Sequence, residues 1–60
     1  MFKLCVLASD FQWKLMGDYE LLPDAEKEAI RIYNDLGYDC LVSKKYFDGR
    51  PVEIIKMYKD

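Results

Sequence analysis

Four short apolar segments and one amphipathic helical segment share a chain of only 60 residues. One helix covers one face of a small sheet, so a sheet built from the four segments has a second face that no helix reaches. A chain of this length forms one domain, and its core is near the size at which folding needs help from disulfides, metals or association. The sequence therefore predicts a single domain over residues 1–60 with an unusual second sheet face.

The composition favours a folded protein. Apolar residues make up 52% of the chain and charged residues 33%, which is typical of globular domains and not of disordered tails. The longest wholly apolar run, residues 5–8, is far too short to span a membrane, and the first eight residues lack the length of a secretory apolar region. We therefore expect a soluble, cytoplasmic protein that does not interact with a membrane.

The first half of the chain has the pattern of a hairpin. Residues 2–8 and 13–20 are rich in strand-forming side chains, and residues 9–12 supply the turn. A four-residue turn predicts a register that gathers the larger apolar side chains on one face. The predicted pairs are Phe2 with Tyr19, Leu4 with Gly17, Val6 with Leu15 and Ala8 with Trp13, and on the reverse face Lys3 with Asp18, Cys5 with Met16 and Leu7 with Lys14.

The apolar period changes from two to between three and four in residues 23–36, which predicts a helix. Pro23 suits the first helical position, and Gly37 can adopt the left-handed conformation that ends a helix. The predicted buried stripe consists of Leu22, Ala25, Ala29, Ile32 and Leu36, with Tyr33 at its margin.

A second hairpin follows the helix. Residues 38–46 and 51–58 read as strands, and Asp48-Gly49 between them is typical of a type I′ turn, whose two central residues need positive φ. A two-residue turn predicts the pairs Cys40 with Met57, Val42 with Ile55, Lys44 with Glu53 and Tyr46 with Pro51. A three-residue turn would instead place Cys40 opposite Lys56 and Ser43 opposite Glu53, and we prefer the two-residue turn.

These segments predict an α+β fold of the ββαββ type. The helix returns the chain before the third strand starts, so the third strand runs parallel to the second and antiparallel to the first. We therefore expect a four-stranded, mainly antiparallel sheet in the order 2-1-3-4, with the helix packed on one face.

The second face of this sheet is the candidate binding surface. In the preferred register it is apolar and rimmed by lysine and arginine, and large exposed apolar patches usually mark association sites. Leu7 and Met16 extend it from the first hairpin. The residues predicted to contact a partner are Leu41, Lys45, Phe47, Arg50, Val52, Ile54 and Tyr58.

The chain carries no recognisable catalytic or cofactor motif. It has no histidine, no glycine-rich phosphate loop and no nucleophile with a neighbouring base, so we expect no enzyme activity, no cofactor and no metal site. Cys5 and Cys40 lie 35 positions apart without a metal-ligand spacing. The preferred interpretation is two reduced, buried thiols. A disulfide between them stays open.

A non-catalytic protein-binding module is the preferred function. Such a protein, an inhibitor or adaptor of the kind encoded by phages or other mobile elements, would bind a host protein or a second copy of itself. It would use either the apolar sheet face or an edge strand. One alternative is single-stranded nucleic-acid binding by the basic and aromatic residues Lys44, Lys45, Tyr46, Phe47 and Arg50. The other alternative is a homodimer with a purely structural role.

Overall fold

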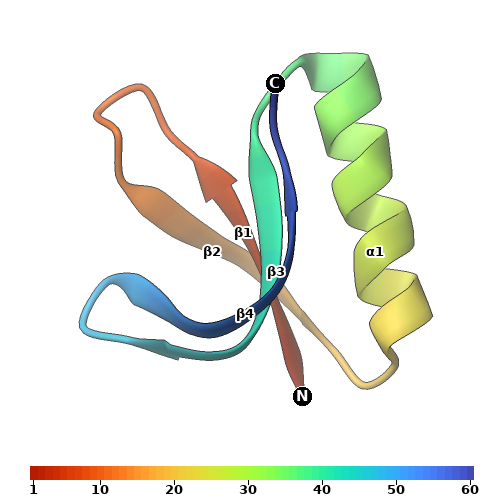
Figure 1. Cartoon of the computed structure of the whole chain (residues 1–60), viewed down its shortest axis with the longest axis vertical. Coiled ribbons are helices and arrows are strands. Elements are labelled where there is room, and N and C mark those ends of the chain that lie inside the picture. The colour runs from red at the N-terminus through yellow and green to blue at the C-terminus, as the bar shows by residue number, and fades with distance from the viewer.

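A computed structural model describes all residues 1–60 as one sheet with one helical layer (Figure 1). The strands form an antiparallel sheet in the order β2-β1-β3-β4, and α1 lies against one face. The α+β class, the ββαββ order and the strand order predicted from the sequence are confirmed. The elements are β1 (Phe2–Leu7), β2 (Trp13–Tyr19), α1 (Leu22–Arg31), η1 (Ile32–Leu36), β3 (Cys40–Phe47) and β4 (Arg50–Tyr58).

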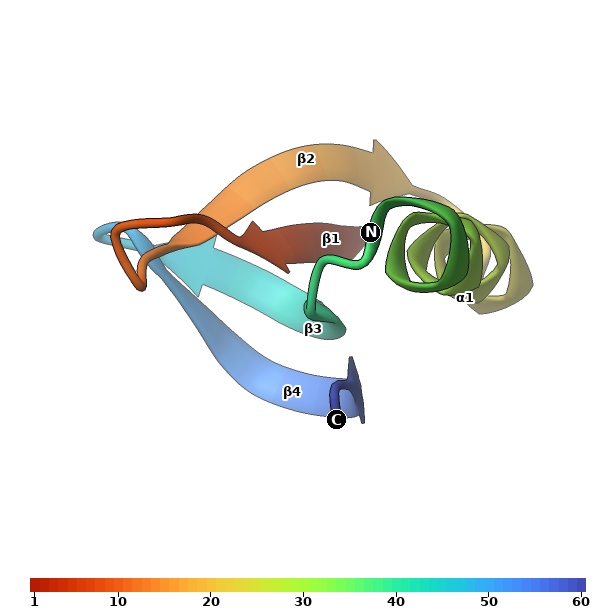
Figure 2. The same ribbon diagram turned by 90° about the horizontal axis from the view of Figure 1, so that it is seen from above.

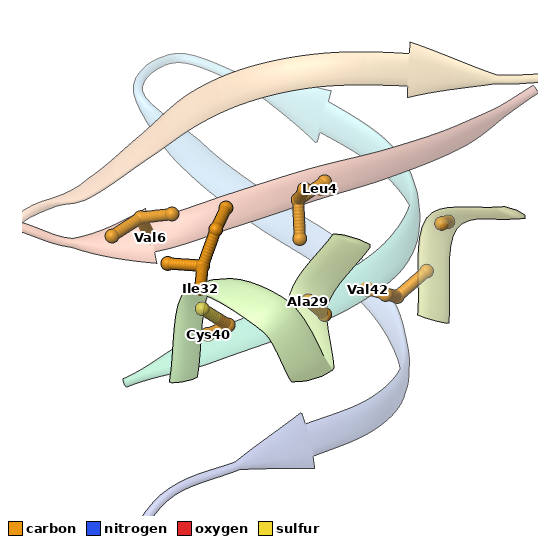
Figure 3. Packing of buried hydrophobic residues seen from close by; sticks show 7 residues of the cluster. Leu4, Val6, Ala29, Ile32, Cys40 and Val42 are labelled. Carbon is orange, nitrogen blue, oxygen red and sulfur yellow. The ribbon is translucent and has the colours of Figure 1, made fainter. Parts of the chain in front are cut away.

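The main core fills the space between α1 and the two central strands (Figure 3). Ala25 and Ala29 are fully buried, and their small side chains let the helix approach the sheet closely. From the sheet side, β1 and β3 supply alternate residues that point toward the helix, as the two-residue period requires. The cluster consists of Leu4, Val6, Ala25, Ala29, Ile32, Cys40 and Val42.

The end of the helix differs from the prediction. Residues 32–36 form a wider π-helical turn, η1, that follows α1 directly. Because the wider turn rotates the last residues, Leu36 leaves the buried stripe and is 56% exposed. Gly37 ends the helix in the left-handed region with φ of 76°, as predicted. Leu36 is therefore available for a role other than packing under the helix.

The sheet buries part of the face that the helix does not reach. Cys5, Leu41 and Ser43 lie on that face by their register, yet all three are 0% exposed. Cys5 and Leu41 do not belong to the cluster under the helix. The Ser43 hydroxyl donates a hydrogen bond of 2.9 Å to the Lys45 carbonyl oxygen, so its burial leaves no polar group unpaired. The sheet therefore has buried residues on both faces.

Two β-bulges explain this burial. Met16 in β2 and Ile55 in β4 have no partner on the neighbouring central strand, because the register shifts by one residue at each. Both bulges lie near the level of the Leu4–Val42 pair, one on each edge of the sheet. Since a bulge bends its strand and increases the local twist, the sheet bends along one line.

The bent sheet closes over its own second face. The Cα atoms of the edge strands β2 and β4 approach within 8 Å, whereas three strand spacings in a flat sheet span roughly 14 Å. The Tyr46 hydroxyl of β3 also donates a hydrogen bond of 2.8 Å to the carbonyl oxygen of Trp13 at the start of β2. β1 lies between these two strands in the sheet order, so the bond joins two strands that are not neighbours in a strongly curved sheet (Figures 1 and 2).

The predicted registers are right on one side of each bulge and wrong on the other. In the first hairpin, the pairs of Phe2 and Leu4 are confirmed, and Lys3 forms an ion pair with Asp18. Beyond Met16 the register shifts. The pairs observed there are Cys5 with Leu15, Val6 with Lys14 and Leu7 with Trp13.

The second hairpin behaves in the same way. Asp48 and Gly49 have φ of 51° and 75°, which confirms the two-residue turn and the pair of Tyr46 with Pro51. Beyond Ile55 the predicted pairs are wrong, because the extra residue shifts β4 by one position. The pairs observed there are Val42 with Lys56, Leu41 with Met57 and Cys40 with Tyr58.

We predict that Leu41→Ala destabilises the protein by about 2–5 kcal/mol, because it leaves a cavity in a fully buried site. Ile54→Ala, at a 49% exposed position on the same face, is the control and should cost less than about 1 kcal/mol. Urea denaturation followed by circular dichroism measures both. Equal losses for the two variants would contradict a sheet that covers its own second face.

Candidate functional site

The predicted partner-binding residues do not form one continuous surface. Phe47, Arg50 and Ile54 are exposed, and Val52 is half-buried. Lys45 is exposed as well and lies 3.5 Å from the Glu53 carboxylate. These residues keep the positions on the second face that the sequence predicted for them.

Two of the predicted residues are in the wrong place. Leu41 is fully buried by the bent sheet and offers no surface to a partner. Tyr58 packs against the core under the helix, and its hydroxyl donates a hydrogen bond of 3.4 Å to the Glu26 carboxylate of α1. The extra residue Ile55 causes the second error, because it moves Tyr58 to the opposite face of β4.

An apolar groove lies on the other side of the molecule, between the end of the helical layer and the first hairpin. It encloses about 440 Å³, which is within the range of binding sites for small molecules and for side chains of a partner. Nine of its thirteen lining residues are hydrophobic. The lining residues are Leu4, Val6, Leu7, Ala8, Ser9, Lys14, Met16, Tyr19, Glu28, Arg31, Ile32, Leu36 and Tyr38.

Two of the irregular elements of the fold contribute to the walls of the groove. The bulge residue Met16 lines it from β2, and Leu36, which the π turn removes from the buried stripe, lines it from the helical side. Tyr38, just after the helix, lines the groove as well. These three side chains are 61%, 56% and 53% exposed, so the apolar surface continues outside the hollow.

Charged residues at the rim are mostly paired with each other. The Arg31 guanidinium donates two hydrogen bonds to the Glu28 carboxylate, and this holds the pKa of Glu28 below its usual range. Lys14 lies 3.6 Å from Asp10, and both side chains are more than half exposed, so this pair is weak. Burial of the ring and the nearby Glu28 charge raise the pKa of Tyr19. Lys14 is thus the most available charge at the rim.

The basic and aromatic residues of the second hairpin are only partly available. The Tyr46 ring is held by its bond to Trp13 and is half-buried, whereas Lys44, Phe47 and Arg50 are exposed. Stacking on an unpaired base needs an open aromatic face, and of the two aromatic residues only Phe47 is exposed.

The two thiols lie on opposite faces of the sheet. Cys40 belongs to the core under the helix, whereas Cys5 pairs with Leu41 on the second face. Both are buried and free, so the preferred prediction is confirmed and no disulfide joins them. Desolvation raises the pKa of Cys40 and raises the pKa of Cys5 to about 11, so neither is a reactive thiolate near neutral pH.

No family model, curated protein or solved structure matches this chain. None of its helical segments has the length and apolar character needed to cross a bilayer. No cluster of three or more potential metal-ligating His, Cys, Asp or Glu side chains is present.

Sequence reasoning missed the groove because its walls come from departures from regular structure. The helical stripe predicted that Leu36 is buried, but the π turn exposes it. A regular strand register predicted that Met16 lies opposite Cys5, but the bulge leaves Met16 without a partner. The sequence carries no local signal for a π turn or for the position of a bulge in β2. Tyr38 directly after Gly37 was the one visible indication of apolar surface at this end.

We predict that the stability of the protein falls between pH 9 and 11, in part because of Cys5. Its pKa rises from 9.0 to about 11 on folding, so the unfolded thiol ionises first and ionisation favours unfolding as the pH rises. Urea midpoints measured across this range should fall less steeply for Cys5→Ala than for the wild type. The tyrosines with raised pKa are common to both proteins and cancel in the comparison. Parallel curves would show that the Cys5 thiol is solvated.

Proposed function

We propose that this protein is a non-catalytic protein-binding module whose apolar groove accepts large hydrophobic side chains of a partner protein. The observation that carries the proposal is the continuity of the apolar surface across the groove and its rim. Met16, Leu36 and Tyr38 are each more than half exposed around an apolar hollow of about 440 Å³. Exposed apolar surface with a concave centre is typical of protein interfaces with side-chain anchors.

The surroundings of the groove favour a protein over a small molecule. A small ligand is usually enclosed and oriented by several convergent polar groups. Here the Glu28 and Arg31 side chains are engaged with each other at the rim, and the exposed apolar residues extend outside the hollow. A macromolecular partner would cover both the hollow and this surrounding surface. Such a protein acts by occupying its partner's surface, as an inhibitor or adaptor does.

Docking in the groove is better supported than extension of the sheet by a partner strand. Strand addition needs a regular row of free backbone groups along an edge. Both edges are interrupted, β2 by the bulge at Met16 and β4 by the bulge at Ile55. β4 also contains Pro51 and a positive φ of 59° at Glu53. We therefore assign the interaction to side chains in the groove and not to an edge strand.

We predict that peptides selected from a random display library on sparsely immobilised protein carry large apolar side chains and bind the groove. Leu36→Glu places a charge in the apolar wall and should weaken the binding of these peptides by about 10-fold or more. Phe47→Ser changes a side chain that is 57% exposed outside the groove and should leave the binding within about twofold. Fluorescence polarisation measures the affinities.

The proposal fails if the library yields no apolar consensus, or if Leu36→Glu leaves the affinity unchanged. Loss of binding in Phe47→Ser alone would place the interface on the second sheet face instead. Circular dichroism of each variant verifies that the fold is retained.

A further inference from the structure

The turn between β1 and β2 carries a strained and exposed aromatic residue, Phe11. Its side chain is 84% exposed, and its backbone has φ of 62°, a conformation that bulky residues rarely adopt. The turn is also one residue shorter than predicted, because Ala8 is bonded to Gln12 and not to its predicted partner Trp13, which pairs with Leu7. In three-residue hairpin turns of this kind, glycine usually occupies the left-handed position.

Phe11 receives almost no compensating contact inside its own chain. Its ring is nearly as accessible as in an unfolded chain, and its backbone is held in a costly region. A strained, exposed aromatic residue of this type is typical of a residue whose contacts lie outside the monomer.

The backbone around Phe11 is firmly held. Ala8 donates a hydrogen bond of 2.9 Å to the Gln12 carbonyl oxygen, and Phe11 donates one of 3.0 Å to the Ala8 carbonyl oxygen. The Asp10 carboxylate accepts a further bond of 3.1 Å from the Gln12 N–H. A side chain presented on such a fixed turn loses little conformational freedom when it is buried by a partner.

The same turn borders the groove. Ala8 and Ser9 line it, so the turn that carries Phe11 forms part of the border of the groove. A symmetric dimer needs this arrangement, because a two-fold axis places each copy's projecting residue against the other copy's hollow only when both lie on one patch.

We propose that a second copy of this chain occupies the groove by inserting its Phe11 ring, with the exchange made reciprocally about a two-fold axis. This inference rests on the proposed docking role of the groove. An apolar hollow of about 440 Å³ accepts an aromatic ring, and Ile32, Met16 and Leu36 offer it apolar contacts.

The charges beside the ring and the groove are complementary. Asp10 precedes Phe11 on the turn, and Lys14 stands at the groove rim. Within one chain these two side chains form only a weak, exposed pair at 3.6 Å. When Phe11 enters the groove of the second copy, Asp10 of each chain comes near Lys14 of the other, so the exchanged arrangement brings opposite charges together at the rim.

Phe11→Gly tests the proposal without endangering the fold. Glycine accepts the left-handed conformation freely, so the variant should be at least as stable as the wild type in urea. Sedimentation equilibrium from micromolar to millimolar concentration should show a dimer for the wild type. Each of the two exchanged rings should contribute roughly 30-fold to the association constant, so Phe11→Gly should weaken dimerisation by about three orders of magnitude. Phe47→Ser, at an exposed site outside the groove, is the matched control and should still dimerise.

Isotope-filtered NMR on a mixture of labelled and unlabelled wild type gives the geometry. The expected result is intermolecular contacts between the Phe11 ring and the methyl groups of Met16 and Leu36. A wild type that stays monomeric at millimolar concentration overturns the inference, as does a dimer that persists in Phe11→Gly or that contacts another face. If peptides still bind the groove in a manner sensitive to Leu36→Glu, the docking role stands and only the identity of the partner is wrong. If they do not, both proposals fail.

Discussion

The need to bury two apolar sheet faces with one helix dominates this structure. The helix covers the side of Leu4 and Val42, and the sheet itself covers Cys5 and Leu41 on the other side. Burial of apolar surface contributes about 25 cal/mol per Å², so a domain of 60 residues can hardly leave so much of it in water. The two bulges at one level of the sheet bend it, so that the sheet itself covers its second face.

Irregular structure also explains where the remaining apolar surface lies. Once the bent sheet has covered Leu41, the second face is no longer the broad exposed platform that the pattern indicated. The bulge at Met16 and the π turn at the end of the helix instead expose side chains around a hollow on the helix side. The bulge at Met16 thus contributes both to the bending of the sheet and to the candidate interface.

Most of the architecture could be predicted from periodicity and turn chemistry. The change in period at Pro23, the left-handed stop at Gly37 and the Asp48-Gly49 turn define the elements, and chain direction then fixes the strand order. The candidate site could not be predicted in this way. The position of a bulge depends on how the whole sheet packs. One extra residue such as Ile55 moves the side chains that follow it in the strand, including Tyr58, to the opposite face of the sheet. Local sequence patterns do not indicate where such a bulge lies.

The two cysteines can be used to follow how the molecule unfolds, because they are buried on opposite faces of the sheet. Cys40 is sealed by the helical layer and Cys5 by the bent sheet, so each thiol becomes accessible only when its own layer separates. The rates at which an alkylating reagent modifies Cys5 and Cys40 would report the opening of the two layers separately. Equal rates for the two thiols would indicate that the helical layer and the bent sheet open together, and different rates would indicate that they open in sequence.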